Sequence, residues 1–167
     1  MRRLVALVEG ISDWCARVSA VLLGLMTLLI LTEILLWNTA KTSTLIADEY
    51  SAYGLAIIIF LGAGYCLKER GHIRITLVLG FLPEKLAKII AVAATALTTV
   101  FMGYICYYLI KMTLAAYRYG STSGTLTETP LWIPQAIMCL GAVVFCLQLA
   151  ATTVRTVWAL HTDEDPL

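Results

Sequence analysis

The stretch FLGAGYCLKERGHIRI (residues 60–75) changes from apolar to strongly basic and then becomes apolar again. An apolar run that contains two glycines is followed by four potential cations, Lys68, Arg70, His72 and Arg74. Basic side chains that join two apolar runs are typical of the short links between membrane spans, where they lie at the lipid headgroups. The stretch therefore predicts a membrane protein.

The composition of the whole chain supports this prediction. The chain has 167 residues, of which 60% are hydrophobic and 14% are charged, whereas a soluble domain carries about a quarter charged residues. A helix needs about 20 mostly apolar residues to cross the hydrocarbon layer. Four windows are near or above that length and carry no charge except Glu33 in the first: residues 18–40, 50–67, 89–110 and 129–154. We expect an all-α integral membrane protein with four transmembrane helices.

Two segments are expected to lie along the membrane surface. Residues 1–17 have apolar side chains at three- and four-residue steps, which is typical of an amphipathic helix; a helical extension of the first span into water remains open. Residues 73–82 are too short to cross a bilayer as a helix, and a strand there would leave backbone groups unpaired in lipid. Pro83 suits the first turn of the next helix.

The chain is thus predicted to form one membrane domain, residues 1–167. Its parts are an interfacial helix (1–17), a first span (18–38), a second span (49–67), an interfacial arm helix (72–83), a third span with a cytoplasmic extension (84–115), a fourth span (130–157) and a cytoplasmic tail (158–167).

The distribution of basic residues predicts the orientation of these spans. If the spans alternate, nine of the 12 Lys and Arg side chains lie on the side of the two termini. The other side receives Lys41, Lys111 and Arg118. By the positive-inside rule, both termini are expected in the cytoplasm.

Motifs for catalysis or metal binding are scarce. The only histidines are His72 and His161, and the five cysteines form no Cys-x-x-Cys pair. The cysteines are expected to pack as small hydrophobic residues. We therefore expect no enzyme activity, no metal and no cofactor in this chain, and no nucleic-acid partner.

Glu33 is the ionisable residue that stands out, because a charged group inside a span is a functional hypothesis by default. It is a candidate proton-coupling carboxylate, as in small four-helix exporters with a glutamate in their first span. It also lies near the expected outer end of the span, where a structural carboxylate could reach water or Lys41. Both interpretations remain open.

Span three has a small residue at every fourth position, a pattern that allows another helix to approach closely. The stripe consists of Ala87, Ala91, Thr95, Thr99 and Gly103. It could serve packing within this chain or against a partner. In span four, Gln135 and Gln148 are expected to form interhelical hydrogen bonds.

Several motifs together resemble the small membrane subunit of tripartite ATP-independent periplasmic (TRAP) transporters. They are the pair Asp48-Glu49, the stretch quoted above, Phe81-Leu82-Pro83, and TPLWIPQ at residues 129–135. The residues expected to have structural roles in these motifs are Asp48, Glu49, Phe60, Gly62, Gly64, Pro83, Pro130, Trp132 and Pro134. One departure is that the family often has an arginine late in span one, where this chain has Glu33 or its neighbours.

The resemblance implies a multi-pass subunit of the bacterial inner membrane. It implies two protein partners: a large multi-span subunit that holds the substrate and sodium sites, and a periplasmic protein that delivers an organic acid. The small subunit would anchor the large one and help to dock the periplasmic protein, with Glu49, Arg118 and Glu128 as candidate docking residues. The basic stretch, Lys68, Arg70, His72 and Arg74, would bind phospholipid headgroups, each basic residue contributing about 1 kcal/mol.

Two other classes of protein are alternatives to this one. A homodimeric proton-coupled exporter would need Glu33 and would transport alone. A four-span thiol oxidase would need paired cysteines in its external loops, and this chain has none there.

Overall fold

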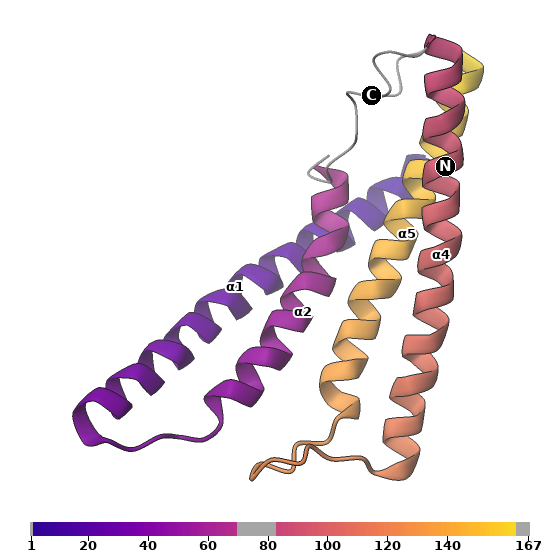
Figure 1. Cartoon of the computed structure of the whole chain (residues 1–167). Coiled ribbons are helices and arrows are strands. Elements are labelled where there is room, and N and C mark those ends of the chain that lie inside the picture. The colour runs from indigo at the N-terminus through magenta and orange to yellow at the C-terminus, as the bar shows by residue number, and fades with distance from the viewer. Residues whose placement is uncertain (1, 70–82, 163–167) are drawn as a thin grey trace.

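The computed structural model describes residues 2–69 and 83–162, and nearly all of them are helical. The helices are α1 (Arg2–Ala40), α2 (Ala47–Lys68), α4 (Glu84–Tyr119) and α5 (Trp132–Thr162) (Figure 1). Each contains a segment long and apolar enough to cross a membrane: Val5–Ala40, Ala47–Lys68, Ile89–Tyr119 and Trp132–Arg155. The prediction of four membrane-spanning helices is confirmed. Within the described ranges, the only β-type pairing is an isolated bridge between Thr122 and Pro130.

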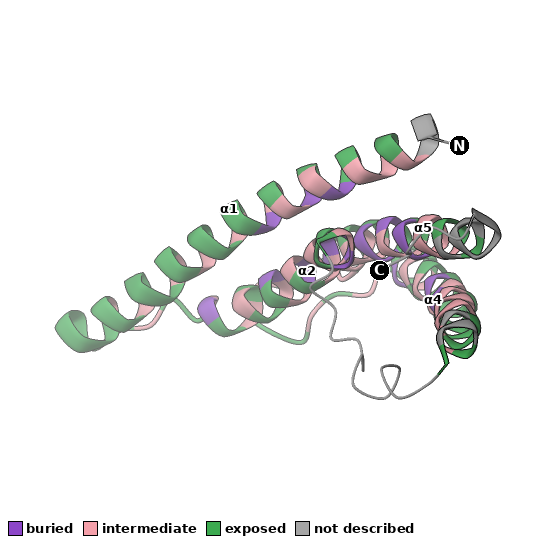
Figure 2. Ribbon diagram, turned by 90° about the horizontal axis from the view of Figure 1, so that it is seen from above, coloured by how far each residue is buried: buried purple, intermediate pink, exposed green. Residues whose placement is uncertain are grey.

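The helices lie in the order α1–α2–α5–α4, so that α2 and α5 are central and α1 and α4 are the flanks (Figures 1 and 2). Helix α1 also contacts α5. The links 41–46 and 120–131 lie together at one end of the bundle, which we call the loop end. The opposite end, called the terminal end, holds the start of α1 and the end of α5 (Figure 1).

Helix α1 runs without a break through the boundary that the sequence predicted at residue 17. No proline interrupts residues 2–40, so nothing forces the backbone to turn there. Ser12 and Cys15 of this first part are buried, whereas Leu7 and Trp14 are exposed. Residues 2–17 are thus continuous with the first span as one helix, and their place along the membrane surface stays a prediction.

The other helix ends follow local sequence signals. The Pro83 carbonyl accepts the backbone N–H groups of Leu86 and Ala87, and α4 begins directly after it. Helix α4 ends at Tyr119, and the next residue, Gly120, has a left-handed backbone (φ 59°). The N–H groups of Gly120 and Ser121 donate to the carbonyls of Tyr117 and Ala116. Helix α5 continues to Thr162, so residues 158–162, which the sequence assigned to a tail, are helical.

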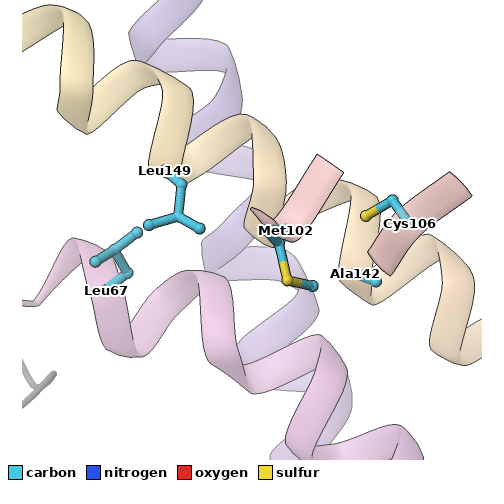
Figure 3. Packing of buried hydrophobic residues seen from close by; sticks show 5 residues of the cluster. All are labelled: Leu67, Met102, Cys106, Ala142 and Leu149. Carbon is cyan, nitrogen blue, oxygen red and sulfur yellow. The ribbon is translucent and has the colours of Figure 1, made fainter. Parts of the chain in front are cut away.

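The core has two clusters that meet on α5. One joins α2, α4 and α5 and contains Leu67, Met102, Cys106, Ala142 and Leu149 (Figure 3). The other joins α1, α2 and α5 and contains Cys15, Ile57, Leu61 and Val144. Because α2 and α5 each contribute to both clusters, the central pair connects the two flanks. Buried positions accordingly concentrate on α2 and α5 (Figure 2).

Gly141 brings the two central helices into direct backbone contact. A Cβ atom at this position would lie 2.7 Å from the carbonyl carbon of Phe60 and 2.8 Å from the nitrogen of Leu61. These neighbours are backbone atoms and cannot move aside as a side chain can. The central pair α2–α5 therefore requires glycine at residue 141.

Candidate functional site

A polar cluster at the terminal end attaches α1 to both central helices. Lys68 Nζ of α2 lies 2.5 Å from Asp13 Oδ1, and Arg155 of α5 lies 2.7 Å from Glu9 Oε1. The Ser12 hydroxyl donates a hydrogen bond of 3.4 Å to Gln148 Oε1, and both residues are buried. These contacts, which we call the terminal-end cluster, explain why this part of α1 packs on the bundle.

The position of Lys68 changes the interpretation of the opening stretch. Its ammonium group is paired with Asp13 of α1 and lies 3.8 Å from Glu69, with 23% of the side chain exposed. Lys68 therefore has a role within the bundle, in addition to any contact with lipid. Arg70, His72 and Arg74, and the predicted arm helix 72–83 apart from Pro83, lie outside the described residues.

The glycines of the quoted stretch lie on the side of α2 that meets α1. A Cβ at Gly64 would lie 3.2 Å from the Ser12 hydroxyl, and one at Gly62 would lie 3.9 Å from the Ser19 hydroxyl. Phe60 is half-buried, and its backbone touches Gly141. This stretch therefore forms contacts to α1 and α5 before it reaches the basic residues.

At the loop end, Glu49 binds the link between α4 and α5. The hydroxyls of Thr125 and Thr127 both donate hydrogen bonds to Glu49 Oε2. Within the link, Ser123 N–H donates to the Thr129 carbonyl at 2.9 Å, and the Ser123 hydroxyl accepts from Thr129 N–H at 3.0 Å. The start of α2 thus fixes the conformation of a link from the other half of the chain.

The three predicted docking residues have different environments. Glu49 is half-buried and occupied by the two threonine hydroxyls, whereas Arg118 and Glu128 are exposed. Glu128 has a left-handed backbone (φ 44°), which a residue without glycine's freedom adopts only where its surroundings hold it. Asp48 is exposed in the first turn of α2. The surface available to a partner at this end thus includes Arg118, Glu128 and Asp48.

The residues of the TPLWIPQ motif shape the start of α5. Pro130 forms the bridge to Thr122, and its carbonyl accepts the N–H of Ile133 at 3.2 Å. The Trp132 ring packs edge-on against Tyr117 of α4, with ring centres 5.5 Å apart. Pro134 is buried in the first turn, where a helix can accept a residue without an N–H. The motif therefore joins α5 to the end of α4.

Glu33 binds the link between α1 and α2. Its carboxylate accepts hydrogen bonds from the Ser43 hydroxyl, the Thr44 hydroxyl and the Thr44 N–H, the last at 3.1 Å to Oε2. Leu45, the next residue, has a left-handed backbone (φ 60°) that costs energy for a non-glycine residue. Glu33 therefore acts as a structural carboxylate in this conformation.

The small-residue stripe of α4 faces α5 in part. The hydroxyls of Thr99 and Thr153 lie 3.0 Å apart, across the two helices. Thr95, Ala87 and Ala91 are half-buried, and a Cβ at Gly103 would meet no atom within 4 Å. Gln148 forms the expected interhelical hydrogen bond, but the side-chain oxygen of Gln135 is buried without a hydrogen-bond partner among the described residues.

Sequence reasoning missed the contacts that hold the helices in register. Asp13 and Lys68 are 55 residues apart, and Ser12 and Gln148 are 136 residues apart, so no local pattern connects them. Gly141 carries a weak signal, because glycine is common in membrane spans. In the described part of the chain, no group of three or more His, Cys, Asp and Glu side chains could hold a metal ion.

Comparison with known proteins identifies the family. No curated protein and no solved structure matched the chain. A family model described as "Tripartite ATP-independent periplasmic transporters, DctQ component" matches residues 6–158, which include all four spans except the first residue of the first. Members of this family are transporter components rather than enzymes. The chain is a multi-pass membrane protein and belongs to the family of DctQ components, the small membrane components of tripartite ATP-independent periplasmic transporters.

Proposed function

We propose that this chain is the small permease subunit of a transporter that uses an ion gradient, with sodium as the coupling ion, to take up organic acids across the bacterial inner membrane. One observation carries the proposal beyond the family match. Asp13, Glu33 and Glu49 are each occupied by donors from the same chain. With these carboxylates engaged in structural contacts, the sites for substrate and coupling ion are expected in a partner, the large multi-span subunit.

The proposed role is that of a scaffold. The charge distribution along the sequence supports a cytoplasmic terminal end and a periplasmic loop end. The terminal-end cluster and Gly141 hold α1, α2 and α5 together, and the core cluster with Met102 and Cys106 joins α4 to them. A rigid body of this kind can anchor a subunit that moves in the bilayer, and Arg70, His72 and Arg74 would add contacts to phospholipid headgroups.

The loop end is proposed to help dock the periplasmic substrate-binding protein. Arg118 and Glu128 are exposed there, whereas Glu49 supports the link from beneath by binding two of its threonines. Arg118→Glu and Glu128→Lys should weaken binding of the periplasmic protein, measured by surface plasmon resonance on the purified membrane complex. Arg17→Glu, an exposed charge near the other end, is the matched control. Equal affinities for all variants would argue against docking at this end.

The direct test of the proposed function is to purify the tagged chain from its native membrane in mild detergent and to identify what accompanies it. A large multi-span protein in near-stoichiometric amount is the expected result. A homodimer without any such partner would contradict the proposal and favour the alternative, a small proton-coupled exporter.

The exporter alternative depends on Glu33, and Glu33→Gln distinguishes the two. The glutamine carbonyl can take the place of Oε2 and accept from the Thr44 hydroxyl and N–H, while its amide N–H donates to the Ser43 hydroxyl oxygen. The variant should therefore assemble and support uptake like the wild type. A proton-coupling carboxylate could not be replaced in this way, and complete loss of transport in a normally assembled variant would favour the exporter.

A further inference from the structure

Helix α4 carries three tyrosines on its outer face, near the middle of its membrane-spanning segment. Tyr104, Tyr107 and Tyr108 are 59%, 60% and 49% exposed. In the segment Ile89–Tyr119, Tyr104 is equally far from both ends (104 − 89 = 119 − 104). At 1.5 Å per residue, Tyr108 lies about 6 Å and Lys111 about 10 Å from that midpoint. All four side chains thus begin inside a hydrocarbon layer about 30 Å thick.

These side chains form one continuous surface. The rings of Tyr104 and Tyr108 have centres 4.7 Å apart, and those of Tyr107 and Tyr108 are 5.3 Å apart. Lys111 follows one turn later and is exposed. The opposite side of α4 supplies Met102 and Cys106 to the core. We call Tyr104, Tyr107, Tyr108 and Lys111 the α4 tyrosine face.

The polar atoms of this face are not satisfied by the bundle. Among the described residues, the Tyr107 hydroxyl has no hydrogen-bond partner and Lys111 has no ion-pair partner. Lipid tails offer no acceptors, and polar groups inside a membrane usually face protein or water for that reason. Tyrosine on a lipid-facing surface is favoured at the headgroups and not at the centre.

Helix α1 provides an internal comparison, because its exposed surface around Leu28 presents no hydroxyl that lacks a hydrogen-bond partner. Leu25, Leu28 and Leu31 are more than half exposed and purely aliphatic. The nearby hydroxyls of Thr27 and Thr32 donate to carbonyls of their own helix, at 2.8 and 2.7 Å. Lipid tails can cover this surface without leaving a hydrogen bond unmade.

We propose that the α4 tyrosine face is the surface on which the large membrane subunit packs, and that α1 faces lipid; this rests on the proposed function. The partner chemistry required is a transmembrane helix with oxygen acceptors at the depth of Tyr107 and a carboxylate opposite Lys111. A second copy of this chain does not fit. In a homodimer whose two-fold axis lies along the membrane normal, the two Lys111 side chains would lie at the same depth. Helix α4 has no acidic residue after Glu84 that could pair with them. Charge complementarity therefore favours a different protein.

The test is site-specific photo-cross-linking in the assembled complex. The photoreactive residue p-benzoylphenylalanine replaces Tyr107 in one variant and Leu28 of α1 in the matched control. The tagged chain is then irradiated in native membranes, and products are identified by mass spectrometry. A product with the large subunit from position 107 and none from position 28 is expected.

Each other outcome has a defined meaning. A large-subunit product from position 28, or from neither position although the large subunit co-purifies, would overturn the assignment of faces and leave the proposed function standing. A product between two copies of this chain from position 107 would overturn the charge argument. Absence of any co-purifying large subunit would contradict the proposed function itself, and the inference with it.

Discussion

The two flanking helices, α1 and α4, occupy equivalent places beside the central pair but differ in what they expose. Both are long and mostly exposed, and each contributes to a different one of the two core clusters. Around Leu25, Leu28 and Leu31 the outer surface of α1 is aliphatic, and the hydroxyls of Thr27 and Thr32 are satisfied within the helix. That of α4 carries tyrosines and a lysine. The difference indicates that hydrophobicity alone does not tell lipid-facing from partner-facing surface, whereas the supply of hydrogen-bond partners does.

The comparison depends on an intact central pair, and Gly141→Ala should damage it most. The added Cβ would meet the backbone of Phe60 and Leu61 at 2.7–2.8 Å, so α2 and α5 must separate. Overpacking of this kind costs about 1–3 kcal/mol. We expect lower membrane yield and a clearly lower melting midpoint in detergent. Gly103→Ala, where no atom lies within 4 Å, is the control and should melt like the wild type. Equal midpoints for the two variants would show that the helices do not meet at residue 141.

Removing the hydroxyls of the α4 tyrosine face should weaken binding of the large subunit to this flank. The triple variant Tyr104→Phe, Tyr107→Phe and Tyr108→Phe keeps the rings and the bundle contacts. Interhelical hydrogen bonds in membranes average about 0.6 kcal/mol, so three would change affinity for the large subunit by about twentyfold. The measurement is the amount of large subunit recovered with the tagged chain. Leu25→Ala, Leu28→Ala and Leu31→Ala on α1 should leave recovery unchanged, and an equal loss from both triple variants would refute the distinction.

The terminal-end cluster tests how α1 is held, with a smaller expected effect. Asp13→Lys places two cations together, and Lys68→Asp places two carboxylates together. Each variant should melt below the wild type, whereas the double variant restores an ion pair of opposite polarity and should recover most of the loss. Thermal unfolding in detergent measures this recovery. A double variant that melts as low as the worse single variant would mean that the two side chains do not pair.

The smallest expected effect comes from the buried hydrogen bond between α1 and α5. Ser12→Ala removes the donor to Gln148, and because the bond is long at 3.4 Å, the cost should not exceed about 0.6 kcal/mol. The control is Thr98→Ala, because the Thr98 hydroxyl is exposed and bonds only to Ala94 of its own helix. A loss several times larger for Ser12→Ala would indicate that this site, and not the ion pairs, holds α1.

The sequence was sufficient to predict four spans, because uncharged windows of that length have few other uses. It was also sufficient to identify the family, through motifs such as FLGAGYCLKERGHIRI and TPLWIPQ. The order of the helices could not be predicted from the sequence, since a leucine that faces lipid and one that faces α5 look alike in it. Lys68 shows the same limit: its charge and its position between apolar runs suggest a headgroup contact, and only the fold reveals Asp13 beside it. Glu33 could not be decided from sequence because its donors, Ser43 and Thr44, lie beyond the end of the helix.

The most direct test of the difference between the two flanks is a cryo-electron microscopy map of the complex purified from native membranes. We expect the large subunit to contact Tyr104, Tyr107 and Tyr108 of α4, with an acidic side chain near Lys111. We expect lipid density along Leu25, Leu28 and Leu31 of α1. A map in which the large subunit covers α1 while the tyrosines of α4 face lipid would contradict these expectations.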